Sequence, residues 1–283
     1  MAASTKRLWN TPFRSECVLP RIRYARGLEI LVQSIRKASP EQYQVASGDV
    51  CAARWMDESL ASFLPDFAYQ NSPADLAPDG QPMGLTAELT GSDWLSATAS
   101  LLPERLQGGL RHFAILGEDS IAEFISASEP GILPPGAGGS PLPPSKGKLG
   151  VDDAWIEEVL DEERLLIRVE VCDSGEGEKY DITVEGAVAV SVYIAEVAAS
   201  DPLTPDPGWL SPLGHRLFRV RESAWIAHIK KHFDAVDAWY GEVMHFSLES
   251  KNLRVDFLCT FDPQVTLKDN CKEPSGPPYD TKN

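Results

Sequence analysis

Two stretches of the sequence, LRHFAILGEDSIAEFISASEP at residues 110–130 and VMHFSLESKNLRVDFLCTFDP at residues 243–263, align with each other without a gap. The alignment pairs His112 with His245, Phe113 with Phe246, Glu123 with Asp256, Phe124 with Phe257 and Pro130 with Pro263. Each stretch holds two apolar runs separated by polar turn residues, which is typical of a β-hairpin. Self-similarity of this kind indicates a chain built from two related units.

The similarity continues towards the N-terminus. Gly84–Trp94 parallels Gly214–Trp225 with one inserted residue, and Tyr43–Gly48 parallels Tyr180–Gly186 more loosely. We therefore predict two diverged copies of a unit of about 100 residues, at 28–130 and 165–265. Chance similarity between short alternating segments is the alternative.

Each unit has the predicted element order β-β-β-α-β-β. In the second unit, strands are expected at 165–172, 180–193 (bent at Gly186) and 217–221, and a hairpin at 243–248 and 253–259. Its helix begins at Glu222 or Ser223 and carries one apolar arc: Trp225, Ile229, His232, Phe233, Val236 and Tyr240. In the first unit, strands are expected at 28–35, 43–55 and 85–89, a helix at 92–106 broken near Pro103, and a hairpin at 110–116 and 121–126. This order predicts an α+β fold of antiparallel layers, in which the two units cover each other or join edge to edge.

Other segments flank the two units. Residues 1–27 form a predicted basic arm with six bases against Glu16, and the arm either folds back on the acidic body or binds nucleic acid. Residues 131–150 are rich in Pro and Gly and are expected to be a linker. Residues 151–163 are predicted to start a helix ahead of the second unit, within a second domain at 151–267. Residues 268–283 are expected to be a flexible tail.

The charge balance limits the classes of partner. Lys and Arg number 26 against 42 Asp and Glu, a net charge of -16, so nucleic acid outside the arm and anionic membranes would meet net repulsion. The densest carboxylates precede the second unit: Asp152, Asp153, Glu157, Glu158, Asp161, Glu162 and Glu163. They form either a solvated face or the docking patch of a basic protein.

Cysteine usage and hydropathy indicate the compartment. The five cysteines are an odd number without a CxxC pair, which favours a reducing environment. The first 30 residues lack the apolar run of a signal peptide, and no run has the length of a membrane span. We expect a cytoplasmic protein that does not enter a membrane.

Few residues offer chemistry. The sequence holds no Gly-rich phosphate loop, GxSxG or HExxH, and we expect no cofactor. His228 and His232 have the spacing of a zinc pair, but two lysines lie between them, so they are weak metal candidates. His112 and His245, with Glu123 and Asp256 across the hairpins, could form acid–base sites. Strand parity leaves open whether each carboxylate shares a face with its histidine, and a purely structural role for each histidine is the alternative.

The leading hypothesis is a non-enzymatic, acidic protein-binding module that engages a basic partner, as a toxin-neutralising protein or a regulatory subunit. In composition, the chain resembles the small acidic immunity proteins that neutralise basic toxins, although the resemblance covers no motif. One alternative is a hydrolase that uses His112 or His245, and another is a structural protein that associates with itself. The sequence leaves the oligomeric state open.

Overall fold

The fold is known from a computed structural model, which describes residues 4–8, 17–24, 27–34, 42–57, 60, 85–117, 120–133, 153–160, 164–171, 178–200, 202–211, 213–250 and 253–268. The predicted tail from residue 269 onwards and most of the predicted linker, 134–150, lie outside these ranges.

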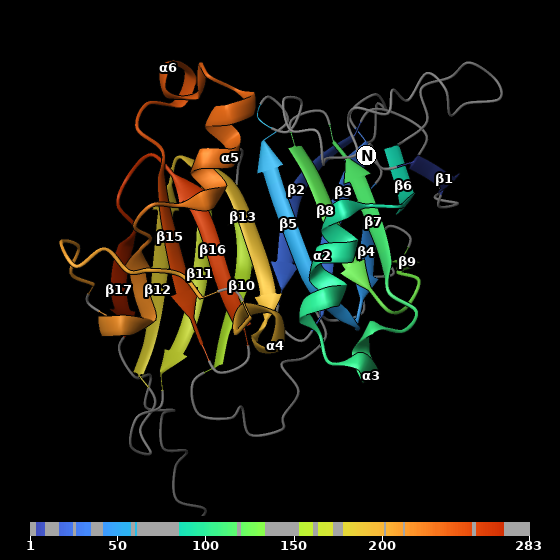
Figure 1. The fold of residues 1–283 in the computed structure, drawn as a ribbon, viewed down its shortest axis with the longest axis horizontal. Helices are drawn as coiled ribbons and strands as arrows, with labels where there is room; N and C mark the ends of the chain where they lie inside the picture. Colours follow the sequence, from blue (N-terminus) through green and yellow to red (C-terminus); the bar gives the residue numbers. More distant parts are fainter. Residues whose placement is uncertain are drawn as a thin grey trace, which may run out of the picture.

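The described strands form two antiparallel sheets (Figure 1). The nine-stranded sheet has the order β1 (Ser4–Leu8), β6 (Leu85–Thr90), β7 (Arg111–Leu116), β8 (Ser120–Ser126), β5 (Val50–Asp57), β13 (Ala187–Ile194), β16 (Leu253–Cys259), β15 (Met244–Glu249) and β14 (Leu217–Arg219). The eight-stranded sheet has the order β17 (Gln264–Lys268), β12 (Glu178–Glu185), β11 (Arg164–Val171), β10 (Asp153–Leu160), β2 (Cys17–Tyr24), β3 (Leu28–Ser34), β4 (Gln42–Ser47) and β9 (Gly131–Leu133). The chain is therefore a mixed, sheet-dominated α+β protein.

The strand order of each sheet repeats from its centre outwards. From the centre, the larger sheet gives β5-β8-β7-β6 in one direction and β13-β16-β15-β14 in the other. The smaller sheet gives β2-β3-β4-β9 and β10-β11-β12-β17. The two halves thus join edge to edge in both sheets, through the pairs β5–β13 and β2–β10.

A sharp turn moves the chain from one sheet to the other within each half. The segment predicted as one bent strand at 180–193 is two strands, β12 and β13, which belong to different sheets. Gly186 lies between them with a φ of 61°, and a Cβ at this position would overlap the Thr260 side chain. The segment predicted as one strand at 43–55 is likewise divided into β4 and β5. Each half therefore contributes to both layers of a sandwich, rather than forming one layer alone.

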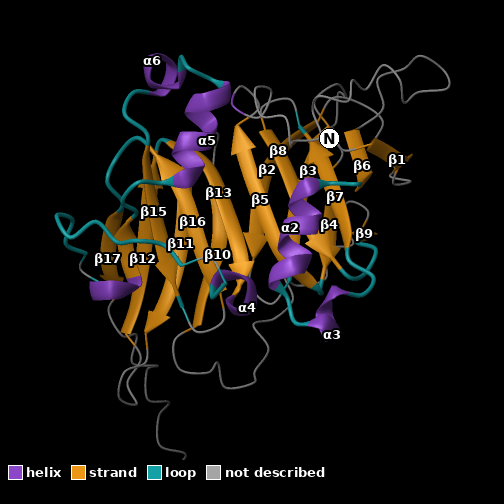
Figure 2. Ribbon diagram, in the orientation of Figure 1, coloured by secondary structure: helices purple, strands orange, loops and turns teal. Residues whose placement is uncertain are grey.

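The helices lie on the outer face of the larger sheet (Figure 2). They are α2 (Asp93–Leu101), α3 (Glu104–Gln107), α4 (Ala195–Ala198), α5 (Ala224–His232) and α6 (Val236–Tyr240). The expected single helix up to Tyr240 is two helices, because α5 ends at His232. The apolar arc predicted to include His232 is also wrong at that residue, which is exposed, whereas Phe233 beside it is buried. Of the helices in the described ranges, none has the length and apolar character needed to cross a membrane.

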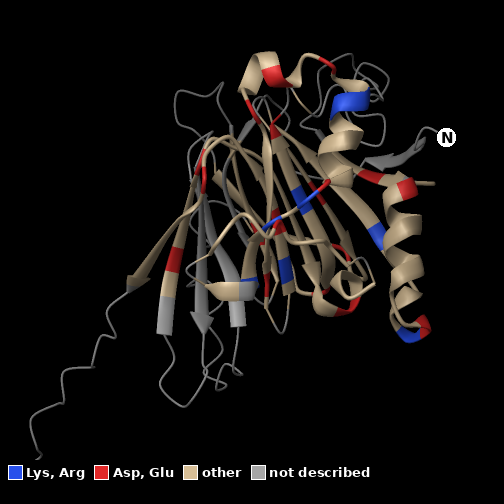
Figure 3. Cartoon of the chain, turned by 60° about the vertical axis from the view of Figure 1, so that its left-hand side comes forward, with Lys and Arg blue, Asp and Glu red and all other residues tan. Residues whose placement is uncertain are grey.

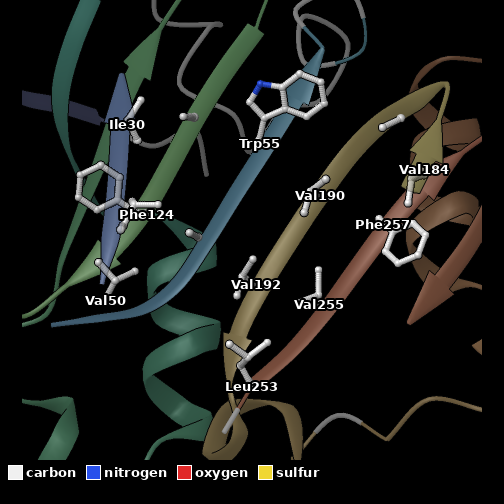
Figure 4. Packing of buried hydrophobic residues seen from close by; sticks show 14 of the residues in the cluster. Ile30, Val50, Trp55, Phe124, Val184, Val190, Val192, Leu253, Val255 and Phe257 are labelled. Carbon is white, nitrogen blue, oxygen red and sulfur yellow. The ribbon is translucent and has the colours of Figure 1, made fainter. Parts of the chain in front are cut away.

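The main core fills the space between the two sheets (Figure 4). Ile30 from β3 and Val184 from β12 face Phe124, Trp55 and Phe257 of the larger sheet, and all five are buried. A second apolar cluster lies under α5 and α6 on the outer face of the larger sheet, where Ile229, Phe233 and Val236 pack. Both faces of the larger sheet are therefore covered, which explains its nearly continuous burial.

Two segments differ from the sequence-based expectation. The acidic segment predicted to start a helix forms strand β10, which pairs with β11 along its whole length and with β2 at Ile156. The hydrogen bonds to β11 and β2 outweigh the helix preference of this segment, because β10 joins the two halves of the smaller sheet. The predicted basic arm also contributes strands: β1 pairs with β6, and β2 pairs with β3.

Candidate functional site

Each histidine shares a sheet face with its carboxylate, which settles the parity left open by the sequence. Glu123 pairs directly with Ala114, and His112 lies two residues before Ala114 on β7. Asp256 pairs directly with Ser247, two residues after His245 on β15. Each carboxylate is therefore a diagonal neighbour of its histidine, within side-chain reach.

The first-half tetrad consists of Ser92, His112, Glu123 and Arg54. The Ser92 hydroxyl lies 2.8 Å from His112 Nδ1, and His112 Nε2 lies 3.5 Å from Glu123 Oε2. Arg54 donates from Nε to the same carboxylate at 2.7 Å. Trp94 covers the group: its ring meets His112 edge-on at 5.0 Å and lies 4.2 Å from the Arg54 guanidinium. Every member of the tetrad is buried, and His112 is fully enclosed.

The second-half tetrad consists of Ser223, His245, Asp256 and Arg254. The Ser223 hydroxyl lies 2.8 Å from His245 Nδ1, and His245 Nε2 lies 4.0 Å from Asp256 Oδ1. Arg254 Nε lies 3.0 Å from Asp256 Oδ2, and Trp225 meets His245 edge-on at 5.5 Å. The serine–histidine–carboxylate geometry repeats that of the first half, except that the shorter Asp leaves a wider gap to the histidine. The arginines differ, because Arg54 lies on a strand next to that of Glu123 whereas Arg254 lies on the same strand as Asp256.

Each serine also caps a helix. Ser92 Oγ accepts from the Leu95 N–H at 3.1 Å at the start of α2, and Ser223 Oγ accepts from the Ile226 N–H at 3.1 Å at the start of α5. A serine hydroxyl that accepts the backbone bond keeps its own proton and a second lone pair, so it can also bond histidine Nδ1. In both halves this chain of contacts fastens the helix N-terminus to the sheet.

The two tetrads meet in one polar row across the larger sheet. Glu123, Arg54, Ser191 and Asp256 pair in sequence on the neighbouring strands β8, β5, β13 and β16. All four are buried, and basic and acidic segments lie on neighbouring central strands in Figure 3. The two tetrads together hold two carboxylates, of Glu123 and Asp256, and two guanidinium groups, of Arg54 and Arg254, so their charges balance, as burial of ionised groups requires.

The second-half tetrad borders a pocket, and its histidine is held neutral. The pocket has a volume of about 440 Å³, and its lining includes Ser223, His245, Arg219 and Lys230. Burial, together with the charge of Arg254, lowers the pKa of His245 to about 4. At neutral pH this ring is therefore an uncharged but weak base. The serines of the two tetrads differ in exposure: Ser223, which lines the pocket, is half-buried, whereas Ser92 is buried.

The other predicted site residues are not brought into a centre. His228 and His232 lie on the exposed side of α5 with ring centroids 4.8 Å apart, and the described residues include no group of three metal-ligating side chains. Of the predicted acidic patch, Asp153, Glu157 and Glu158 lie on β10. Asp152, Asp161, Glu162 and Glu163 lie outside the described residues.

Sequence reasoning missed part of each tetrad. Arg54, Arg254 and the histidine bonds of both serines were not anticipated. One signal was available: each serine precedes the tryptophan of its unit by two residues. The arginines carried no common signal, because Arg54 lies on β5 whereas Arg254 lies on β16, beside its own carboxylate.

Comparison of the chain with family models, with curated proteins and with solved structures finds no significant match.

Proposed function

We propose that this chain is a non-enzymatic binding protein whose acidic surface engages a basic protein partner. The observation that carries the proposal is the imbalance of exposed charge. Among the described side chains, the exposed bases are Arg105, Arg221, Lys230 and Lys231. The exposed carboxylates are Asp49, Asp93, Glu104, Glu129, Glu185, Glu196, Glu222, Asp234, Asp237, Glu242, Glu249 and Asp262.

Internal pairing further reduces the basic charge that is available at the surface. The described ion pairs include Arg54–Glu123, Arg111–Glu88, Arg219–Glu242, Arg221–Glu222, Lys230–Asp237 and Arg254–Asp256. Each pair uses one base and one carboxylate, so the surplus of carboxylates remains. A surface of this kind accelerates encounter with a basic protein and rejects acidic competitors.

The proposed partner is a basic toxin or a basic subunit that the chain regulates. We include the acidic segment 152–163 among the proposed contacts. A cytoplasmic location accords with the free, buried thiols of Cys51 and Cys259.

The test is capture of partners on the immobilised full chain, followed by reconstitution with the purified partner. We expect a basic protein whose affinity falls steeply between about 50 mM and about 500 mM salt, because the Debye length shortens. The test variant changes Glu104, Glu185 and Glu249 to Gln. Compared with the parent chain, it should bind the partner more weakly, and its affinity should depend less on salt. If the affinity for the partner changes neither with salt nor with these substitutions, the proposal is wrong.

The second candidate is a hydrolase centred on Ser223, His245 and Asp256. It is favoured by the chain of contacts from the serine through the histidine to the carboxylate, and by the adjoining pocket. Two features make it the weaker one: the low pKa of His245 and the cap bond that Ser223 already accepts. Covalent labelling by a fluorophosphonate would support it if Ser223→Ala abolished labelling while Ser92→Ala did not. Absence of labelling on the folded protein would remove it.

We also propose that the two halves are diverged copies of one ancestral unit. The mirrored strand orders and the two tetrads support this origin. Under this origin, the first half keeps the tetrad as a structural element, and the tetrad of the second half is free to acquire another role.

A further inference from the structure

The second-half site differs from the first-half tetrad and its surroundings at positions where the change costs stability. Residue Glu222, just before the helix cap, has a φ of 54° and is the one non-glycine residue with positive φ in the described ranges. The corresponding residue before the cap of α2 is Gly91, with a φ of 67°. A left-handed conformation favours glycine, so glutamate is held there against its backbone preference.

The inner end of the site shows a second set of differences. Ser247 pairs with Asp256, where the first half pairs Ala114 with Glu123. Ser247 Oγ is buried without a hydrogen-bond partner in a side chain that is 0% exposed. His245 Nε2 is also buried without a hydrogen-bond partner, as His112 Nε2 is in the first half, but His245 borders the pocket. Buried polar atoms normally have partners, so a polar group that reaches His245 from the pocket would be stabilised. Glu222 in place of Gly91 and Ser247 in place of Ala114 thus make the second site more polar than the first, and Glu222 makes it more strained.

The rim of the pocket carries both signs of charge. Arg219 contacts Glu242 at 3.3 Å, Lys230 contacts Asp237 at 2.7 Å, and Glu222 contacts Arg221 at 3.6 Å. These are exposed pairs, which a ligand can exchange at small cost. Apolar side chains complete the lining: Val220, Ile226, Val243 and Met244. A volume of about 440 Å³ is within the range of small-molecule sites.

We propose that this pocket binds a small zwitterion of the aliphatic α-amino-acid class. The ammonium group meets the Glu222 carboxylate, which explains why glutamate is kept at a left-handed position. The carboxylate meets Arg219 and Lys230, the two bases of the lining. The aliphatic side chain covers the apolar wall, and His245 supplies a polar atom at the inner end. This site is independent of the basic protein partner proposed above.

Calorimetric titration of the full chain with L-leucine tests the proposal, with leucinamide and N-acetyl-leucine as probes that lack one charge each. Leucine should bind, and each blocked analogue should bind at least about tenfold more weakly, since each loses a charge-assisted contact. The proposal is overturned if leucine at about 10 mM gives no heat of binding, or if all three probes bind with equal affinity.

Variants of Glu222 separate strain from binding. Glu222→Gly should raise the melting temperature of the free protein and abolish leucine binding. Glu222→Gln should also abolish binding but leave the melting temperature unchanged, because it keeps the backbone strain. Asp49→Asn, which changes an exposed carboxylate outside the pocket lining, should alter neither. If Glu222→Gly raises the melting temperature and leucine binds as before, the strain has no connection with a ligand and the proposal is wrong.

Discussion

Replacing Glu123 by Gln removes one charge from a buried ion pair with almost no change in volume. Arg54 and Glu123 have side chains that are 8% and 0% exposed, and Arg54 Nε donates to Oε2 at 2.7 Å. Loss of one partner of a buried pair typically costs about 3–5 kcal/mol, because the remaining charge stays out of water. For a protein of this size each kcal/mol lowers the melting temperature by about 2–4 °C, so Glu123→Gln should melt roughly 10 °C below the parent.

The control is the half-buried pair of Arg111 and Glu88 on the neighbouring strands β7 and β6. Its side chains are 27% and 17% exposed, and Arg111 keeps Glu129 at 3.3 Å. Glu88→Gln should therefore cost about 1 kcal/mol or less. Adding Arg54→Met to Glu123→Gln should recover most of the loss, because the pair then leaves no unpaired buried charge behind. Equal melting temperatures for Glu123→Gln and Glu88→Gln in a thermal scan would refute this account of the buried pair.

The remaining predictions concern the caps, the pH dependence and the tryptophans. Ser223→Ala should cost about 1 kcal/mol in urea unfolding, because water in the pocket can replace the lost hydroxyl at His245 Nδ1. Ser92→Ala should cost about 2 kcal/mol, because His112 is fully buried and its Nδ1 is left without a partner. An equal cost would show that the difference in burial between the two histidines has no effect. Since the folded-state pKa of His245 is about 4 and the unfolded-state value about 6.5, the unfolded chain binds more protons in this window, so stability should fall as pH drops from about 6.5 to 4. His245→Gln should flatten that slope, and an unchanged slope would assign it to other groups. Trp225→Ala should destabilise the protein by about 2–3 kcal/mol, because the half-buried indole packs on His245, whereas Trp239→Ala, at 65% exposed, should change stability by less than about 0.5 kcal/mol. Loss of a bound partner by Trp225→Ala at an unchanged melting temperature would make Trp225 an interface residue instead.

Local patterns in the sequence predict most of the elements around the helices. The hairpins after each helix are correct, as are the N-cap at Ser223 and the helix break near Pro103. These features depend on neighbours in the chain: alternation, a capping hydroxyl, and a residue that cannot continue a helix.

Long-range pairing is what the sequence does not reveal. The strand pattern of 180–193 is continuous, and it does not show that β12 and β13 belong to different sheets on either side of Gly186. The acidic segment that forms β10 is a strand because β2 and β11 lie on either side of it. The partner of Glu123 is equally hidden, since Arg54 lies 69 residues away and reaches the carboxylate through strand pairing alone.

The presence of two tetrads in one chain bears on how a serine, a histidine and a carboxylate in contact should be interpreted. In the first half the group is sealed under Trp94, caps α2 and balances Arg54, so stability alone accounts for every contact. The same contacts in the second half therefore need no catalytic explanation. What stability does not account for is the departure from the first half: a glutamate where a glycine is preferred, and a buried serine hydroxyl without a partner. Such costs persist where a site is used, and they direct experiments to Glu222 and Ser247 before the triad itself.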